Sequence, residues 1–505
     1  MNHASLPADW IGGWNDFAHR VAIVDGARTL TYAELAGFVV AAARELQSQG
    51  LQPGDRVALV LESSWQYVVC YFAVLLAGGV VVPLNPAARD RDLGSWILRA
   101  EATCVIADHS YAGLAALRAV LPAGCRMRVC GGEGDPLVAG RDVVSDRSGF
   151  PVASAHALAA ILFTSGTTGA PKGVMLTQGN LGANAAAIVD SLALSADDSV
   201  MAVLPFTYAY GNSVLLSHLS CGARVVIQRG FGFPQAVVES MVRERVTGFA
   251  GVPSTFALLL SRVRLDGFDL GGLRYVSQAG GAMPGALLQK LISALPGKEI
   301  FVMYGQTEAT ARLTCMPSTQ LSLKPGSVGL PLRGVQIRIR DAAGEDLPAG
   351  SVGDIWASGP NIMAGYWRDP AVTSEVLREG WLKTGDVGRL DDEGFLYIVG
   401  RRSDIIKVGA HRVHPQDIED VLAELPGVSE CAVVGVGDEI LGEVVKAFIV
   451  RRPEATLQEQ HVKRHCLENL AAYKVPKFVQ FVAQLPRTSS GKVQRSLLQN
   501  PQEMS

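Results

Sequence analysis

The sequence predicts an α/β protein of more than one domain, and three observations support this. Over roughly the first three hundred residues, short apolar runs of strand length alternate with helical stretches, a pattern typical of parallel sheet with crossover helices. After about residue 325 the elements become shorter and long helical patterns cease. At 505 residues the chain is too long for one compact domain, so two or three domains are expected.

The first long element is a helix predicted within residues 29–50. Thr31 is a suitable N-cap, Glu34 completes a capping box three residues later, and Gly50 ends the helix. The apolar stretch at 68–82 is shorter than the ~20 residues that a membrane span needs, so we expect a buried helix followed by a buried strand. Further strands are expected within 56–62, 78–84, 102–108, 158–163, 200–206, 223–229 and 299–305.

The last third of the chain has a different pattern. Residues 334–359 read as strand, turn and strand, which fits a small barrel or an antiparallel sheet. Residues 390–400 are predicted as a hairpin that ends at Arg401. About a hundred residues with their own helices and strands follow, so this segment is expected to be a separate α+β unit.

Composition excludes several functional classes. The chain is 48% hydrophobic and 18% charged, and its net charge of −3 favours neither a nucleic-acid binder nor a basic membrane-surface protein. Eight cysteines without CxxC pairs indicate neither a disulfide framework nor a zinc site. The N-terminus lacks a basic region followed by an apolar core, so no signal peptide and a cytoplasmic location are expected.

The string FTSGTTGAPKGV at 163–174 is the most informative part of the chain. Its glycines allow backbone N–H groups to approach an anion, its hydroxyls donate hydrogen bonds, and its lysine adds a positive charge. It differs from the Walker loop because Pro171 precedes the lysine and Gly173 follows it. A glycine- and threonine-rich turn without a ligand is the alternative, which the length and order of the string disfavour. The predicted triphosphate-binding residues are Thr164, Ser165, Gly166, Thr167, Thr168, Gly169 and Lys172.

Four later strings complete a pattern: YGQTEAT at 304–310, WLKTGDVGRL at 381–390, GRRSDIIKVGAHRVHPQDIE at 400–419 and LPRTSSGKVQR at 485–495. Together with the first string, in this order and spacing, the chain resembles the adenylate-forming superfamily over nearly its whole length. The resemblance implies an N-terminal AMP-binding domain over 1–400 and a mobile C-terminal domain over 401–505. It also implies a hinge near Arg402 and Ser403, and ATP-dependent activation of a carboxylic acid.

The resemblance also assigns roles to residues that would bind the nucleotide. Tyr304 and Gly305 would contact the adenine, Thr307 would contact the α-phosphate, and Glu308 would bind magnesium through hard carboxylate oxygen. Asp386 lies in a Thr-Gly-Asp sequence, and outside the family's motif such an aspartate is more often an ordinary turn residue. The remaining expected nucleotide contacts are Asp386 and Arg401 at the ribose, Tyr397 against the nucleotide, and the small residues Gly280, Gly281 and Ala282 beside the adenine and the acyl pocket.

In the C-terminal segment the resemblance implies two sets of residues. Lys492 would bridge the carboxylate and the α-phosphate during adenylation, whereas Lys407 and Arg412 would act after the domain rotates for thioester formation. Two positions depart from the family pattern. Ser403 occupies the hinge position that usually carries Asp or Lys, and Ala410 stands where the family usually has a glycine that lines the pantetheine tunnel.

The segment at 204–213 matches the family's acyl pocket. Relatives that activate α-amino acids place an aspartate where this chain has Ala209, so an ammonium group would be unpaired and costly to bury. With Tyr208, Tyr210 and Phe206 nearby, a fatty or aromatic acid is expected. The expected acceptor is the thiol of coenzyme A. The alternatives are a ligase that loads the phosphopantetheine of a separate carrier protein and, in another class, an inactive nucleotide- or acyl-binding relative.

Overall fold

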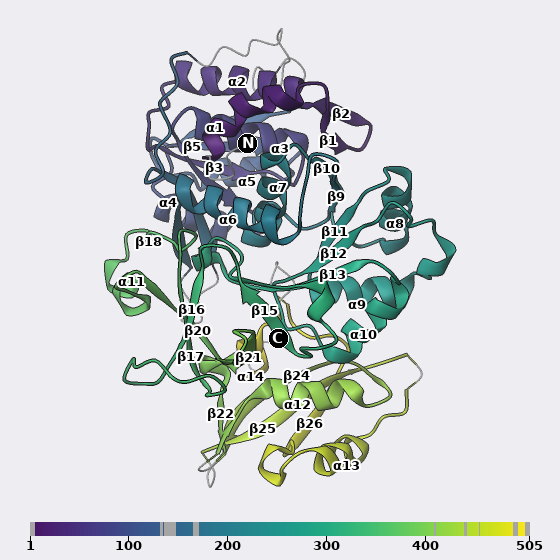
Figure 1. The fold of residues 1–505 in the computed structure, drawn as a ribbon. Coiled ribbons are helices and arrows are strands. Elements are labelled where there is room, and N and C mark those ends of the chain that lie inside the picture. The colour runs from purple at the N-terminus through teal and green to yellow at the C-terminus, as the bar shows by residue number, and fades with distance from the viewer. Residues whose placement is uncertain are drawn as a thin grey trace.

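The computed structural model describes residues 6–131, 135, 148–164, 171–408, 411–438, 442–453, 455–487 and 493–499. It confirms the α/β class and the division into a large N-terminal and a small C-terminal part (Figure 1). The N-terminal part contains two large sheets, and the C-terminal part has its own sheet at the lower end of the view. No helix among the described residues has both the length and the apolar character needed to cross a membrane.

The first large sheet has a parallel centre in the order β1-β10-β9-β11-β12-β13, with β2 antiparallel at its edge. The carboxyl ends of β11, β12 and β13 therefore lie side by side, which is where ligands bind in open α/β sheets. The strands are β1 (Val21–Asp25), β2 (Arg28–Thr31), β9 (Ser199–Ala202), β10 (Arg224–Ile227), β11 (Gly248–Gly251), β12 (Tyr275–Gln278) and β13 (Glu299–Tyr304).

The second large sheet has the order β18-β8-β7-β4-β3-β5-β6. Its strands from β7 to β6 are parallel, and β8 and β18 extend it in antiparallel fashion. Its members are β3 (Arg56–Val60), β4 (Val80–Leu84), β5 (Cys104–Asp108), β6 (Arg126–Cys130), β7 (Leu158–Thr164), β8 (Lys172–Thr177) and β18 (Gly365–Tyr366).

Helices cover both faces of both sheets, because the strands are apolar on each face. In β3, Val57 and Leu59 face the layer between the sheets, whereas Ala58 and Val60 face an outer core. The inner layer holds α1 (Pro7–Gly13), α2 (Tyr32–Ser48), α3 (Trp65–Leu76), α6 (Gln178–Ser191) and α7 (Ala209–Ser220). The outer helices are α4 (Asp90–Arg99) and α5 (Leu114–Ala119) on the second sheet, and α8 (Pro234–Arg243), α9 (Pro253–Arg262) and α10 (Gly285–Ala294) on the first.

The helix predicted within 29–50 is confirmed as α2. The Thr31 side chain accepts from the backbone N–H of Glu34, and the Glu34 carboxylate accepts from the backbone N–H of Thr31 at 2.7 Å. This is the predicted capping box. Gly50, just beyond the helix, has the left-handed φ of +86° that favours glycine. The buried helix and strand expected within 68–82 are α3 and β4.

The segment expected as a small barrel is an antiparallel arrangement in the order β16-β17-β20-β21-β15, and it joins the first sheet through β14. Ile339, Ile355 and Leu396 form a small core of its own. The hairpin predicted over 390–400 corresponds to the turn and the second strand of the β20–β21 hairpin. This hairpin begins earlier, at Trp381, and ends at Arg401 as expected. The elements are β14 (Thr314–Met316), β15 (Ser327–Pro331), β16 (Gln336–Arg340), β17 (Gly353–Ser358), α11 (Pro370–Val376), β19 (Leu377–Arg378), β20 (Trp381–Leu390) and β21 (Leu396–Arg401).

The C-terminal part is an α+β unit around a mostly antiparallel sheet. A single turn of 3-10 helix, η5 (Arg402–Asp404), joins it to β21. Val433, Val445 and Ile449 contribute to its separate core. Its elements are β22 (Ile406–Val408), β23 (His411–Val413), α12 (Pro415–Glu424), β24 (Val428–Asp438), β25 (Gly442–Arg451), α13 (Glu459–Asn469), β26 (Phe478–Val482) and α14 (Arg495–Gln499).

A partly buried ion pair between Asp198 and Arg274 links the amino ends of the central parallel strands. Asp198, which precedes β9, accepts hydrogen bonds from Thr247 Oγ1 at 2.8 Å and from Arg274 Nη2 at 3.0 Å. Thr247 and Arg274 immediately precede β11 and β12. Burial alone would raise the pKa of Asp198, but these hydrogen bonds, one from the Ser195 backbone and the Arg274 charge outweigh it and hold the pKa below its ordinary value.

We therefore expect Asp198→Ala to lower the free energy of unfolding by about 3 kcal/mol, because it leaves a partly buried cation with one fewer partner. Since the folded pKa of Asp198 is lowered, its contribution is complete above the unfolded pKa of about 4 and is lost as pH falls through the folded pKa. Urea unfolding at pH 7 and near pH 3 measures this. Asp197→Ala is the control, because that side chain is 88% exposed and its loss should cost under about 1 kcal/mol. Equal losses for both variants would contradict the assignment.

Candidate active site

The YGQTEAT string forms a tight loop at the carboxyl end of β13. A Cβ on Gly305 would lie 2.0 Å from the carbonyl oxygen of Ala311, so this close approach requires glycine. Thr310 has a left-handed φ of 67°, and its Oγ1 donates to the carbonyl of Asn361 at 2.6 Å, which holds that conformation. The loop therefore has a fixed path, and it presents Glu308 at the edge of the sheet.

Three of the predicted nucleotide-binding residues meet at this edge. The hydroxyl of Tyr304 donates to Asp386 Oδ2 at 2.6 Å, and Arg401 Nε lies 3.4 Å from Asp386 Oδ1. Asp386 and Arg401 face each other across the β20–β21 ladder, which explains why the hairpin brings them together. Burial first, and then the charge of Asp386, raises the pKa of Tyr304 well above its ordinary value, so the hydroxyl stays a neutral donor.

A second cluster joins the phosphate-loop strand to the same loop. Tyr366 on β18 donates its hydroxyl to Glu308 Oε1 at 2.9 Å. The Nζ of Lys172 lies 5.3 Å from the centroid of the Tyr366 ring. Thr164 pairs with Lys172 across the β7–β8 ladder, as expected for the two ends of one loop. The residues between them that were predicted to contact phosphates, Ser165, Gly166, Thr167, Thr168 and Gly169, lie outside the described residues.

Tyr366 is a residue that the sequence reasoning missed. It lies 58 positions beyond Glu308 and belongs to none of the five strings. It comes to the site because β18 pairs with β8, with Tyr366 opposite Val174. Thr307 precedes Glu308 in the 3-10 helix η3 (Thr307–Ala309), so both predicted residues lie within one turn of this contact.

The segment predicted to contact the acid begins α7. Tyr208 is its N-cap residue, and the Tyr208 hydroxyl accepts from Asn85 Nδ2 at 2.8 Å. Ala209 is the first helical residue and packs against the inner core. The hydroxyl of Tyr210 donates to the carbonyl of Ser277 on β12 at 2.9 Å, which fixes α7 against the sheet.

The small residues after β12 lie beside this helix. Gly280 has a φ of +84°, and a Cβ there would be 3.3 Å from Val252 and 3.9 Å from Tyr210. Gly281 and Ala282 follow it and are exposed. Beneath the start of α7 lies a small apolar gap that is too narrow to admit a water molecule. It is bordered by Ala202, Val203, Leu204, Gly211, Val214 and Ala250.

The surroundings of Tyr210 are less apolar than the sequence suggested. The guanidinium of Arg312 covers its ring, with the central carbon 4.9 Å from the ring centroid. Arg312 is 1% exposed. In the sequence Arg312 is the one charged residue of the ATARLTC string, and this pattern does not reveal what its side chain contacts.

Tyr397, which was expected against the nucleotide, contacts residues outside the two clusters described above. Its ring lies under the guanidinium of Arg389 at 4.1 Å, and its hydroxyl donates to Asp391 at 3.4 Å. It precedes Arg401 by four residues on β21, which corresponds to about 13 Å along a strand. These contacts tie Tyr397 to the turn of the hairpin rather than to the Tyr304–Asp386 pair.

The C-terminal candidates lie on the first hairpin of the small sheet. Lys407 on β22 is exposed, and its backbone N–H donates to Glu443 Oε2 at 2.7 Å. Lys407 pairs with Arg412 on β23, so the two candidates are cross-strand neighbours. Lys492 and Ala410 lie outside the described residues. Arg487 and Val493, on either side of Lys492 in the sequence, pair in an antiparallel bridge.

The predicted hinge carries an ion pair between the two parts of the chain. Arg402, in η5, donates to Asp354 Oδ1 on β17 at 2.5 Å, and Lys383 Nζ lies 3.2 Å from the other oxygen. The Asp354 side chain is only 3% exposed. Ser403, where the family usually has Asp or Lys, donates to the neighbouring Asp404 at 2.9 Å.

The residues present suit a magnesium ion bound together with phosphates. Among the described residues, no group of three or more His, Cys, Asp or Glu side chains could hold a metal alone. Magnesium in nucleotide sites commonly uses one or two carboxylates, with phosphate oxygens and waters completing its shell. Glu308 supplies a carboxylate, and both Glu308 and Lys172 contact Tyr366. A carboxylate that accepts one hydrogen bond retains further acceptor capacity.

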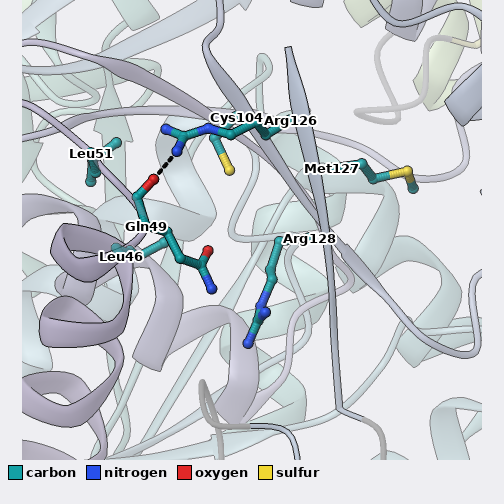
Figure 2. Close-up of a pocket in the computed structure, with 7 residues that line it drawn as sticks. All are labelled: Leu46, Gln49, Leu51, Cys104, Arg126, Met127 and Arg128. Carbon is teal, nitrogen blue, oxygen red and sulfur yellow. Dashed lines mark hydrogen bonds between the residues drawn. The ribbon is translucent and has the colours of Figure 1, made fainter. Parts of the chain in front are cut away.

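A pocket of about 500 Å³ lies away from these clusters (Figure 2). It is formed by α2, β5 and β6, at the edge of the second sheet opposite β8. Arg126 Nη1 donates to the backbone carbonyl of Gln49 within it. None of its lining residues belongs to the five strings: Leu46, Gln49, Leu51, Cys104, Arg126, Met127 and Arg128.

The described residues form a candidate nucleotide-binding site next to an apolar segment. Lys172, the carboxylate of Glu308 and the Tyr304–Asp386–Arg401 cluster lie near the carboxyl ends of the parallel strands. The apolar start of α7 lies beside them. Ligands bind at this edge in open α/β sheets, and small-molecule sites combine an apolar lining with a few polar groups, so this region is the candidate active site.

Comparison with known proteins gives the family. The model of the AMP-binding enzyme family matches residues 13–367, and that of the AMP-binding enzyme C-terminal domain matches 417–492. A feruloyl-CoA synthase of Amycolatopsis is 35% identical over 94% of each chain. ATP-bound MatB of Rhodopseudomonas palustris is 33% identical and superposes with a TM-score of 0.89 over 98% of each chain. The o-succinylbenzoate CoA synthetase of Bacillus subtilis, solved with its acyl-adenylate, is 28% identical with a TM-score of 0.87, over 97% of this chain and 98% of that one.

The chain belongs to the AMP-binding enzyme family. The expected enzyme class is thereby confirmed as an acid–thiol ligase of the AMP-forming acyl-CoA synthetase type. Such an enzyme uses ATP and Mg²⁺ to convert a fatty or aryl carboxylic acid into an acyl-AMP with release of pyrophosphate, and it then transfers the acyl group to coenzyme A.

Proposed function

We propose that adenylation takes place between the Tyr304–Asp386–Arg401 cluster and the Lys172–Tyr366–Glu308 cluster. A carboxylate oxygen of the acid attacks the α-phosphorus of ATP, the bond from that phosphorus to the bridging oxygen breaks, and pyrophosphate leaves with the electron pair. The observation that carries this proposal is the shared loop after β13, which holds Tyr304 of one cluster four residues from Glu308 of the other.

Each cluster has a distinct task in this proposal. Asp386 accepts hydrogen bonds from the ribose hydroxyls, with Tyr304 and Arg401 fixing its orientation. Thr307 donates its hydroxyl to the α-phosphate, while Lys172 and the loop that it ends hold the outer phosphates. Glu308 and the phosphate oxygens would hold Mg²⁺, which when bound neutralises charge on the phosphates. Lys492 supplies the cation between the carboxylate and the α-phosphate.

Thioester formation follows on the same chain after the C-terminal domain rotates about Arg402 and Ser403. The thiol of the acceptor attacks the acyl carbon, a proton leaves the sulfur, and AMP departs with the electrons of the acyl–oxygen bond. Lys407 and Arg412 then face the site in place of Lys492. Coenzyme A is the acceptor that we favour, and the phosphopantetheine arm of a separate carrier protein presents the same thiol as an alternative.

The acid is an aryl or fatty carboxylic acid rather than an α-amino acid. Ala209 begins α7 and offers no carboxylate to an ammonium group, and an unpaired buried charge costs several kcal/mol. The side chains that pack beneath the start of α7 are apolar and offer no partner to a charged group. We place the enzyme in the cytoplasm, since eight free cysteines are typical of a reducing compartment.

Pyrophosphate release across a panel of acids tests the proposal. Aryl and fatty acids should support release, and proteinogenic α-amino acids should be slower by more than about a hundredfold. Because every acid is assayed with the same ATP and magnesium, differences reflect the acid pocket. A best rate with alanine or proline would show that another residue pairs the ammonium group and would overturn this assignment.

Ala209→Asp should lower kcat/KM for the best aryl or fatty acid by at least about tenfold, because it adds an unpaired carboxylate at the start of α7. Ala209→Asn is the matched control, since it adds nearly the same volume without charge. Pyrophosphate release by the two variants separates charge from bulk. Equal losses would mean that the position acts through size alone.

A further inference from the structure

Arg312 is a buried cation that the proposed chemistry does not use. It lies just before β14, between α7 and β13, and is 1% exposed. Its Nη1 donates to the sulfur of Met303 at 2.9 Å, and its guanidinium lies over the ring of Tyr210. Its Nε is buried without a hydrogen-bond partner, and within the described part of the chain it forms no ion pair with Asp or Glu.

These partners compensate the charge poorly. A thioether sulfur is a weak acceptor, and an aromatic ring attracts a cation less strongly than a carboxylate does. The ionisable groups that act on Arg312 are Tyr210, Cys315 and Tyr275. Burial raises the pKa of Tyr210 and raises that of Cys315 to about 12, so neither is an anion at neutral pH. A buried guanidinium in such surroundings destabilises the fold unless something else pairs with it.

The side chain of Arg312 contacts the segment that is expected to bind the acid. Its side chain contacts Tyr210, in the segment that begins α7. It also contacts Met303, near the carboxyl end of β13 before the nucleotide loop. Its backbone packs against Gly305, where an added Cβ would come within 2.6 Å of Arg312 Cα. Arg312 is therefore buried against Tyr210 of the acyl segment, next to the strand that leads into the nucleotide loop.

We propose that Arg312 determines specificity by binding an oxygen acceptor on the acid, at the end remote from the carboxylate that is activated. The substrate class is then an acid with a second carboxylate, or an aryl acid with a ring oxygen, rather than a plain fatty acid. An oxygen acceptor would replace the weak contact with Met303 and occupy the unpaired Nε. This inference rests on the proposed function, since it places the acid at the start of α7.

Matched acids on the wild-type enzyme test it without any variant. Pyrophosphate release is measured for hexanoate against adipate, and for benzoate against 4-hydroxybenzoate and terephthalate. At least one oxygen-bearing acid should exceed its unsubstituted partner by about tenfold or more in kcat/KM, because a site built to hydrogen-bond a group rejects the analogue that lacks it. The two oxygen types distinguish a requirement for negative charge from a requirement for any acceptor.

The variant is Arg312→Met, which keeps length and apolar volume. It should lower kcat/KM at least about tenfold for the preferred oxygen-bearing acid, leave the unsubstituted partner within about twofold, and leave ATP affinity unchanged. Its melting temperature should be equal to or above that of the wild type, because an unpaired buried charge has been removed. Arg264→Met is the control, since that arginine is 90% exposed and pairs with Asp266 at the surface.

The outcomes distinguish the role of Arg312 from the adenylation reaction itself. Equal or better rates with the unsubstituted acids, or a uniform fall for all acids together with a lower melting temperature, would overturn the role of Arg312 and leave adenylation intact. Absence of pyrophosphate release with every acid would instead contradict the proposed function on which the inference rests.

Discussion

Replacing Lys492 with alanine should reduce acyl-adenylate formation by about 10²- to 10³-fold while ATP affinity changes little. Its charge is needed mainly where negative charge develops between the carboxylate and the α-phosphate, so its loss raises the barrier more than it weakens ground-state binding. Acid-dependent exchange of labelled pyrophosphate into ATP measures adenylation, and calorimetry measures ATP binding.

Lys463→Ala is a suitable control for this variant. Lys463 lies on α13 in the same C-terminal part and pairs with Glu459 one helical turn away, at 2.7 Å on the surface. Its loss should leave exchange unchanged. A Lys492→Ala enzyme that exchanges pyrophosphate at nearly the wild-type rate would remove Lys492 from the reaction.

Substitutions at Lys407 and Ala410 should have the opposite selectivity. Ala410→Leu should obstruct the path of the pantetheine arm and reduce thioester formation by about a hundredfold, while adenylation stays within about twofold. Lys407→Ala should act in the same direction. The reason is that Lys407, exposed on β22, belongs to the hairpin expected to face the site only after rotation.

Single-turnover assays distinguish the two half-reactions. Acyl-AMP is formed first without coenzyme A, and the thiol is then added and the thioester followed. Equal damage to both steps in these variants would argue against two conformations. The ion pair between Arg402 and Asp354 offers a further probe, because it links the first residue of the hinge to β17 in the conformation seen here.

Local patterns predicted much of the fold because the forces they report act over a few residues. The capping box of Thr31 and Glu34 and the hairpin ending at Arg401 were found where expected. The antiparallel segment after residue 325 was expected from its short elements. Its continuity with the first sheet through β14 depends on pairing between strands distant in sequence, which periodicity does not show.

The same limit applies to the site. Tyr304, Asp386 and Arg401 were predicted from strings that carry their chemistry, and their side chains do meet. Tyr366 contacts Glu308 because β18 pairs with β8, and no local sequence pattern predicts this pairing. Tyr397 was expected against the nucleotide, and this stays a prediction; the structure shows its contacts with Arg389 and Asp391, which follow from its place in the hairpin.

The most direct test of the adenylation site is the identity of the products formed without a thiol. Purified enzyme is incubated with ATP, magnesium and an aryl acid, and the products are separated and weighed by mass spectrometry. Attack at the α-phosphorus predicts acyl-AMP and pyrophosphate in equal amounts, both absent when the acid is omitted and both strongly reduced in Glu308→Gln. Formation of ADP with an acyl phosphate would mean attack at the γ-phosphorus and would contradict the assignment.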